Sequence, residues 1–170
     1  MKAKTLPGFS RVDHVGLTVP DLEAAVRFYC EVFGATEVTR LGPFDARELP
    51  ATDGRDWCEA HINVAGARFN FVMLQLGPGM MLELFQYDLP LDRRTDLPRN
   101  CDLGGHHLAL KVENLDKAVD YLRQQPGVRV MSGPIVVTDG LWAGMRVIYF
   151  LDPWGNQLEL VEFSRPSSSP

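Results

Sequence analysis

The stretch that decides the fold is Gly104-Gly105-His106-His107-Leu108-Ala109-Leu110-Lys111-Val112-Glu113-Asn114-Leu115-Asp116-Lys117-Ala118-Val119. Most of it matches an earlier stretch, Asp13-His14-Val15-Gly16-Leu17-Thr18-Val19-Pro20-Asp21-Leu22-Glu23-Ala24-Ala25-Val26. Placing His14 on His107, which lies 93 positions later, also aligns Val19 with Val112 and Leu22 with Leu115. A histidine has therefore been duplicated together with the segment that carries it.

Each copy begins with a strand that is followed by a helix. Apolar residues alternate in 11–19 and again in 106–112, which is the period of a half-buried strand. Helical spacing follows, with Asp21 as the expected N-cap and Gly34 as the stop in the first copy. In the second copy, Asn114 is the expected cap of a helix over 115–124.

Further strands complete two similar modules. In the first, we expect strands over 35–44, 61–64, 68–76 and 80–87, with a long loop over 45–60. In the second, we expect strands over 128–131, 134–138, 144–151 and 157–163. The predicted fold class is therefore α+β, with two βαβββ modules.

The composition of the chain suggests where the modules begin and end. We expect an N-terminal leader over 1–10, the first module over 11–88 and the second over 104–163. Residues 89–103 are rich in proline and aspartate and are typical of a linker. The polar tail 164–170 is predicted to be disordered.

The last strands of the two modules also match, and each carries one glutamate between two leucines. Met81-Leu82-Glu83-Leu84-Phe85 corresponds to Gln157-Leu158-Glu159-Leu160-Val161. Strand alternation places Glu83 and Glu159 on the face opposite the leucines, and it sends His14 and His107 away from the apolar face of their strands. One histidine or glutamate of this kind is usually structural, but the repetition favours a site.

Two imidazoles and two carboxylates are suitable ligands for one divalent first-row ion, and Zn, Ni, Co, Mn and Fe stay open. We expect His14, Glu83, His107 and Glu159 to be the ligands. Either glutamate could also leave the ion and act as the catalytic base. His106 has the opposite parity from His107 and is expected behind the site or beside a ligand. The residues on the ligand face, which should line the substrate pocket, are Gly16, Thr18, Phe85, Ala109, Lys111 and Val161.

The overall composition argues against several kinds of partner. The chain has 170 residues, a net charge of −5 and no run of Lys or Arg, so we expect no binding to nucleic acid or to a membrane. Three cysteines, Cys30, Cys58 and Cys101, form no Cys-x-x-Cys pair and favour a reducing, cytoplasmic location.

With these motifs the chain resembles the vicinal oxygen chelate superfamily, which includes glyoxalase I, methylmalonyl-CoA epimerase, extradiol dioxygenases and bleomycin-resistance proteins. The resemblance rests on Asp13–Val19, on His107–Leu110 and on Asp152-Pro153-Trp154-Gly155-Asn156-Gln157-Leu158-Glu159-Leu160. It implies a cupped sheet, often in a homodimer, with the metal ion in the cup. All four family ligand positions are filled, and the carboxylate at Glu83 favours the glyoxalase and epimerase branch.

The expected function is therefore a metal-dependent isomerase, epimerase or lyase that binds neighbouring oxygens of a small substrate and shifts an α proton. Methylmalonyl-CoA epimerases carry a second carboxylate before the strand that matches 69–76, and Val64-Ala65-Gly66-Ala67-Arg68 has none. A small α-oxygenated or sugar-derived ketone is therefore favoured over a CoA ester. An Fe(II) ring-cleaving dioxygenase and a metal-free binding or resistance protein stay open as alternatives.

Overall fold

The structure is a computed structural model that describes residues 6–163. The chain divides into two compact units between Arg93 and Arg94, and each is described by itself. The predicted tail 164–170 and the first half of the predicted leader lie outside the described residues.

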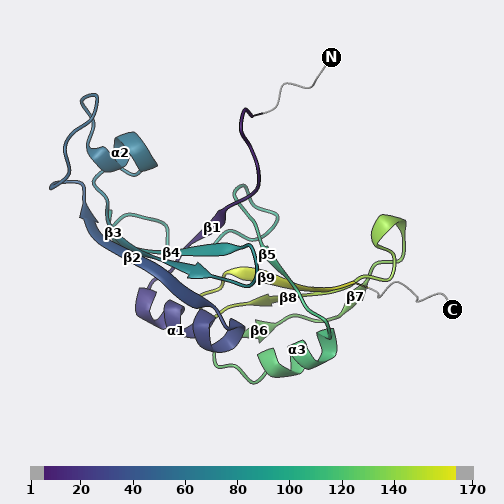
Figure 1. The fold of residues 1–170 in the computed structure, drawn as a ribbon. Coiled ribbons are helices and arrows are strands. Elements are labelled where there is room, and N and C mark those ends of the chain that lie inside the picture. The colour runs from purple at the N-terminus through teal and green to yellow at the C-terminus, as the bar shows by residue number, and fades with distance from the viewer. Residues whose placement is uncertain (1–5, 164–170) are drawn as a thin grey trace, which may run out of the picture. The chain divides into compact units, whose positions relative to one another are not determined.

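Unit 1 is a four-stranded mixed sheet with one long and one short helix (Figure 1). Strands β1 and β4 are parallel neighbours, and β4, β3 and β2 continue the sheet in antiparallel pairs. The elements, in chain order, are β1 (His14–Thr18), α1 (Leu22–Phe33), β2 (Thr36–Asp45), α2 (Trp57–Ile62), β3 (Arg68–Gln75) and β4 (Met81–Leu89).

Unit 2 also begins with a strand and a helix and ends with two long strands, but two short strands and a 3₁₀ helix lie between them. Its sheet runs β5-β9-β8-β6, with β7 also pairing with β8, and β5 is parallel to β9 as β1 is to β4. The elements are β5 (Leu108–Lys111), α3 (Leu115–Leu122), β6 (Arg129–Val130), β7 (Ile135–Val136), the 3₁₀ helix η1 (Gly140–Trp142), β8 (Arg146–Leu151) and β9 (Gln157–Glu162).

One face of each sheet forms the apolar core with the long helix. In unit 1, Tyr29 of α1 and Leu82 and Leu84 of β4 are fully buried. Leu158 and Leu160 take the same places on β9 and are buried as well. Burial of these leucines fixes the register of the final strand, because a shift of one residue would expose them all.

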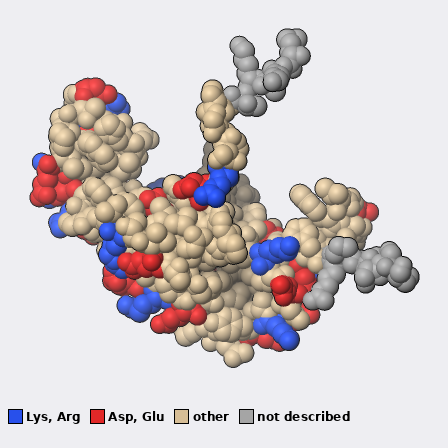
Figure 2. All heavy atoms as spheres, in the orientation of Figure 1, with Lys and Arg blue, Asp and Glu red and all other residues tan. Residues whose placement is uncertain are grey.

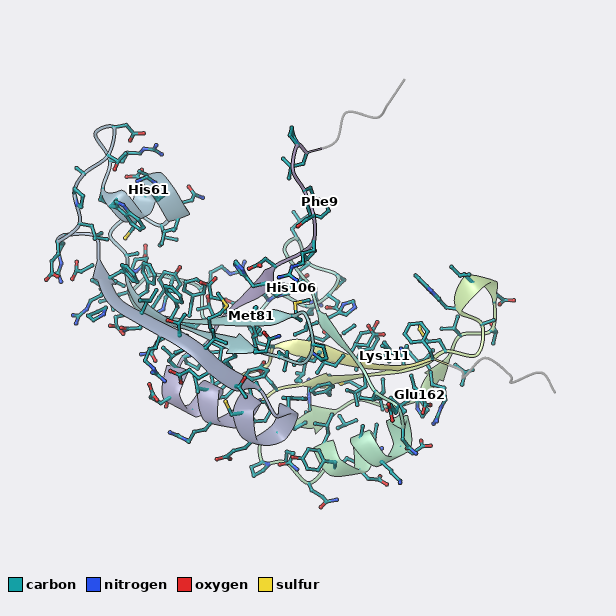
Figure 3. All side chains as sticks on the ribbon, viewed as in Figure 1. Phe9, His61, Met81, His106, Lys111 and Glu162 are labelled. Atoms are coloured by element: carbon teal, nitrogen blue, oxygen red, sulfur yellow. The ribbon has the colours of Figure 1, made fainter. Side chains whose placement is uncertain are left out.

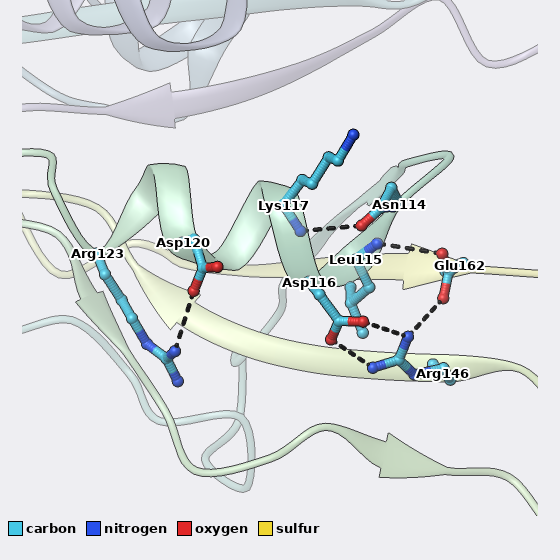
Figure 4. A network of polar contacts seen from close by, with 8 residues as sticks. All are labelled: Asn114, Leu115, Asp116, Lys117, Asp120, Arg123, Arg146 and Glu162. Carbon is cyan, nitrogen blue, oxygen red and sulfur yellow. Dashed lines mark hydrogen bonds and ion pairs between the residues drawn. The ribbon is translucent and has the colours of Figure 1, made fainter.

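The start of each long helix is held to the final strand by the same kind of hydrogen bond. The Leu22 N–H donates to Gln86 Oε1 over 2.8 Å, and the Leu115 N–H donates to Glu162 Oε1 over 3.1 Å. Figure 4 shows that Arg146 of β8 joins the second of these contacts, with Nη1 3.0 Å from Glu162 Oε2 and Nη2 2.6 Å from Asp116 Oδ1. These contacts fix the position of the helix start relative to the strand that carries the glutamate.

The structure confirms the predicted α+β class and both helix caps. Asp21 accepts from the Ala24 N–H, Asn114 accepts from the Lys117 N–H, and Gly34 adopts the left-handed conformation at φ 68°. That conformation costs glycine little, because it has no Cβ to clash with the backbone.

The prediction of a strand over 61–64 was wrong, and the loop predicted over 45–60 is partly helical. Helix α2 covers Trp57–Ile62, with Asp56 accepting from the Glu59 N–H and Asn63 ending the helix at φ 57°. An Asp three residues before a Glu is a helix-start signal that the sequence does contain, but the segment is too short for helical periodicity. Helix η1 was also not predicted.

The surface shows mixed charge. Figure 2 shows acidic and basic side chains interspersed on the visible face, without a broad area of one sign. In residues 6–163, no helix combines the length and the apolar character needed to cross a lipid bilayer.

Candidate metal centre

Unit 1 brings the first predicted histidine and glutamate together. His14 begins β1 and Glu83 lies on β4, where it is the direct partner of Gly16 in the parallel ladder. The His14 Nε2 is 3.4 Å from Glu83 Oε2, while its Nδ1 is 3.0 Å from Asp13 Oδ1. The Glu83 side chain is only 15% exposed, compared with 41% for His14. The pair therefore lies at the margin of the sheet face, with the carboxylate deeper than the ring.

Unit 2 contains an equivalent pair. His107 directly precedes β5, and Glu159 on β9 is the direct partner of Ala109. The His107 Nε2 is 3.1 Å from Glu159 Oε2, and the Asn100 side-chain nitrogen is 3.5 Å from His107 Nδ1. Glu159 is again nearly buried while the ring is partly exposed. The duplicated sequence thus produces a duplicated pair.

The environment of each pair suits a metal-binding role. In both pairs the Nε2 faces the carboxylate. At His14 the Nδ1 can donate to Asp13 Oδ1, which is how ligand histidines are commonly oriented, whereas the neighbour of His107 Nδ1 is the donor nitrogen of Asn100. Two donors that each lie about 2.1 Å from one octahedral ion are about 3 Å apart, so the observed separations need little adjustment. The donor set of imidazole nitrogen and carboxylate oxygen fits a first-row divalent ion.

Burial raises the pKa of Glu83 above its ordinary value, and the nearby His14 opposes this effect in part. A carboxylate that is costly to keep ionised gains from a neighbouring positive charge. A cation bound at this position would therefore stabilise the ionised form.

Within the described part of the chain, neither unit holds a group of three or more His, Cys, Asp or Glu side chains that could bind a metal ion. Each unit supplies two of the four predicted ligands. The joining of the two pairs around one ion stays a prediction.

The predicted pocket residues share the sheet faces of the two pairs. Thr18 is the direct partner of Phe85 on β4, and Lys111 is the direct partner of Val161 on β9. A Cβ added at Gly16 would lie 3.5 Å from the Phe85 ring, so the two residues are neighbours. The Lys111 ammonium lies 5.4 Å from the centre of the Phe163 ring.

The second histidine of the opening stretch, His106, does not share the contacts of His107. It is exposed, and its Nδ1 is 3.2 Å from the carbonyl oxygen of Gly104 (Figure 3).

Sequence reasoning missed three neighbours of the pairs: Asp13, Asn100 and Tyr149. The Tyr149 ring meets the His107 ring edge to face, with centroids 5.3 Å apart, and Tyr149 is the direct cross-strand partner of Glu159. Desolvation raises the pKa of Tyr149, and the charge of Glu159 raises this pKa further. Asp13 adjoins His14 in sequence and could have been noticed. Tyr149 could be found only from the register of β8 against β9.

An aromatic cluster also went unnoticed on the Glu83 face. Phe85 lies 5.4 Å from Phe71 and 5.8 Å from Tyr87, measured between ring centroids. The same cluster packs against Cys58 of α2, which is fully buried. The segment between β2 and β3, which contains α2, therefore covers one end of this face.

The fold and the duplicated His–Glu pairs define a repeat of two related α+β units. The chain belongs to the Glyoxalase/Bleomycin resistance protein/Dioxygenase superfamily, whose family model matches residues 11–160. The resemblance to the vicinal oxygen chelate proteins is thereby confirmed.

One named protein and two solved structures resemble this chain over most of its length. The chain is 46% identical over 171 aligned residues to a 2-epi-5-epi-valiolone epimerase from Actinomyces sp., an alignment that covers 100% of this chain and 87% of the relative. Among solved structures, a glyoxalase family protein from Bacillus cereus matches with a TM-score of 0.71 at 18% identity, covering 97% of this chain and 99% of that one. A glyoxylase/bleomycin resistance protein/dioxygenase domain from Frankia sp. matches with a TM-score of 0.63 at 22% identity, covering 92% and 100%. The two structures support the fold, and the epimerase supports an enzymatic role.

Proposed function

We propose that the protein is a divalent-metal-dependent epimerase that inverts a carbon next to the carbonyl of a small hydroxylated ketone. The observation that carries this proposal is the pair of His–Glu contacts, His14 with Glu83 and His107 with Glu159, at equivalent places of two repeats. The 46% identity to a 2-epi-5-epi-valiolone epimerase supports epimerisation and makes that ketone the first candidate substrate.

The ligands in this proposal are His14, Glu83, His107 and Glu159, supplied by one chain or shared between two copies. A bound divalent cation would supply Lewis acidity, which lowers the free energy of the enediolate that a ketone forms on losing an α proton. A glutamate carboxylate within hydrogen-bond reach of that carbon takes up the proton, and the carbon is reprotonated on its opposite face. The partly buried setting of both glutamates strengthens these electrostatic effects by excluding water.

The other parts of the site would hold the substrate. Thr18 and Lys111 can donate hydrogen bonds to its hydroxyl groups, and Phe85, Ala109 and Val161 can contact its carbon skeleton. The aromatic rings around Phe85 suit the C–H face of a ring ketone better than they suit a phosphate group.

We also propose that the protein works as a cytoplasmic homodimer on a small molecule, without nucleic acid or membrane as a partner. The three cysteines are free, which supports a reducing compartment. Light scattering of the purified chain at micromolar concentration tests the dimer, and a monomer mass would contradict it.

The experiment that tests the function follows α-proton exchange by NMR in heavy water. The protein is stripped of metal, reloaded with Co²⁺ and incubated with 2-epi-5-epi-valiolone. We expect deuterium to appear in substrate and product, and His14→Ala and His107→Ala to lose both exchange and bound Co²⁺.

The matched control is His106→Ala, which removes the neighbouring imidazole and should leave metal content unchanged. Full metal content in His14→Ala and His107→Ala would exclude the proposed ligand set. Oxygen consumption with a catechol, in place of proton exchange, would instead support ring cleavage.

A further inference from the structure

The two candidate ligand histidines have opposite kinds of neighbour at Nδ1. His14 Nδ1 is 3.0 Å from an acceptor, Asp13 Oδ1, so a neutral ring carries its proton on Nδ1 and leaves Nε2 free to bind a cation. His107 Nδ1 is 3.5 Å from a donor, the side-chain nitrogen of Asn100. A ring that accepts a hydrogen bond there carries its proton on Nε2, the atom 3.1 Å from Glu159 Oε2. The pair in unit 2 is therefore not ready to bind a cation in this arrangement.

Asn100 belongs to a folded turn over 99–105. The Asp102 N–H donates to the Arg99 carbonyl oxygen over 2.9 Å, and the Gly105 N–H donates to the Asp102 carbonyl oxygen over 2.8 Å. The Arg99 guanidinium also donates twice to the Asp102 carboxylate, from Nε over 3.0 Å and from Nη2 over 2.9 Å. Such two-point contacts are directional. Together these hydrogen bonds fix the backbone that carries the Asn100 side chain.

Gly105 brings this turn close to His107. A Cβ at Gly105 would overlap the carbonyl oxygen of Arg99, so the start of the turn packs directly against the backbone two residues before His107. Only a residue without a side chain allows so close an approach. The last part of the predicted linker 89–103 therefore lies beside the candidate centre.

An asparagine at this place can serve either state of the ring. Half a turn of its terminal amide exchanges the donor nitrogen for the acceptor oxygen. The present contact is long for a hydrogen bond and joins exposed groups, so its loss costs little free energy. With the oxygen toward Nδ1, the amide accepts the ring proton there, and Nε2 of His107 is free. A cation on Nε2 makes the Nδ1–H a better donor and strengthens this second contact.

We propose that Asn100 is a positioning residue that orients the His107 ring and turns its amide oxygen to Nδ1 when Nε2 of His107 binds a cation. The assignment rests on the proposed function in taking His107 as a metal ligand. It requires no substrate, and it involves residues of unit 2 alone. The ring stays neutral throughout, because the proton that leaves Nε2 for water is replaced by one from water at Nδ1. His14 needs no such change, since Asp13 is already an acceptor.

The first test measures the affinity of the metal-free protein for Zn²⁺ alone by calorimetry. Asn100→Ala removes the amide, and we expect affinity to fall by about 10-fold, the lower end of the usual loss for a partner of a metal ligand, because the contact is exposed. Asn100→Asp supplies an acceptor, as Asp13 does in unit 1, and should bind Zn²⁺ at least as tightly as the wild type.

Leu103→Ala is the matched control, because it shortens a fully exposed side chain of the same turn and should leave Zn²⁺ affinity unchanged. Wild-type affinity in Asn100→Ala would overturn the assignment. An equal loss in Leu103→Ala would also overturn it, since the effect would then come from the turn and not from the amide.

The second test locates the ring protons by long-range ¹H–¹⁵N NMR at about pH 8.5, where an ordinary imidazole is neutral. In the metal-free protein we expect the proton of His107 on Nε2 in the wild type and on Nδ1 in Asn100→Asp, and that of His14 on Nδ1 in both. Saturation with Zn²⁺ should move the His107 proton to Nδ1 in the wild type. A His107 proton on Nδ1 before Zn²⁺ is added would refute the proposed switch.

The two tests also separate this inference from the proposed function. If His14→Ala and His107→Ala bind Zn²⁺ like the wild type, the proposed ligand set is wrong. The spectra of the metal-free protein would still decide whether residue 100 determines which nitrogen of His107 carries the proton. An unchanged His107 tautomer in Asn100→Asp would show that it does not.

Discussion

Gly16→Ala is the most informative single change to the scaffold of the centre. Gly16 lies directly opposite Glu83, and its equivalent in unit 2 is Ala109, opposite Glu159. A Cβ at Gly16 would be 3.5 Å from the Phe85 ring and 3.9 Å from Glu83 Oε2, which is ordinary van der Waals contact. The substitution therefore makes unit 1 resemble unit 2 without a clash.

The expected stability change follows from these distances. Alanine restricts the unfolded chain more than glycine does, and the added methyl group meets atoms at contact distance, so the free energy of unfolding should rise by about 0.4–1 kcal/mol. For a chain of this size, the melting temperature should rise by about 1–4 °C. Calorimetry of the metal-free protein measures this increase.

Ala109→Gly is the matched control and should lower the melting temperature by a similar amount. Because the new methyl group at position 16 only touches Glu83, Co²⁺ affinity should change by less than about tenfold, which is under 1.4 kcal/mol. A Gly16→Ala variant that melts several degrees below the wild type would refute the reasoning. It would mean that Phe85 and Glu83 leave less room beside β1 than the distances indicate.

Three further predictions concern pH, the helix contact and the metal. Burial raises the pKa of Glu83, so in the folded metal-free protein this carboxyl keeps a proton that it loses in the unfolded chain, and the contribution of Glu83 to stability falls as pH rises above about 4.5. Glu83→Gln should therefore melt higher than the wild type at pH 7 and equally near pH 3.5; equal melting at both pH values would contradict this. Glu162→Gln should keep the contact to Leu115, as Gln86 keeps its own contact, whereas Glu162→Ala should unfold at lower urea concentration because the lost hydrogen bond is worth about 1 kcal/mol; equal midpoints would count against the contact. Chelation should abolish α-proton exchange, and readdition of single ions should restore it; full exchange at zero metal content would exclude metal dependence.

Much of the fold could be predicted because the signals are local. Alternation marks the strands, Asp21 and Asn114 mark the helix starts, and the leucines beside each glutamate identify the buried face of the final strand. The short helix α2 could not be recognised in this way, because six residues are too few to display a helical period. Its position depends on the burial of Cys58 against the aromatic cluster, which is a tertiary contact.

From the sequence, the repeats select His14, Glu83, His107 and Glu159 as one set of candidate ligands, but they do not indicate the neighbours of these residues. In the structure, His14 Nε2 lies 3.4 Å from Glu83 Oε2, and His107 Nε2 lies 3.1 Å from Glu159 Oε2. Tyr149 was not found because no residue near it in sequence indicates its partner. Its position opposite Glu159 follows from the register between β8 and β9, which is settled only when the strands pair.

The two faces of each sheet have diverged in different ways since the duplication. On the helix face, both units keep the hydrogen bond from the start of the long helix to the final strand, but the residues around it differ in charge. Gln86 lies opposite Asn70 in unit 1, and the equivalent Glu162 lies opposite Arg146 in unit 2. On the ligand face the neighbours of the glutamates have changed in character. Met73 lies opposite Glu83, whereas Tyr149 lies opposite Glu159, and both His–Glu pairs are kept. The candidate ligands have therefore been retained in both units while the residues beside them have changed.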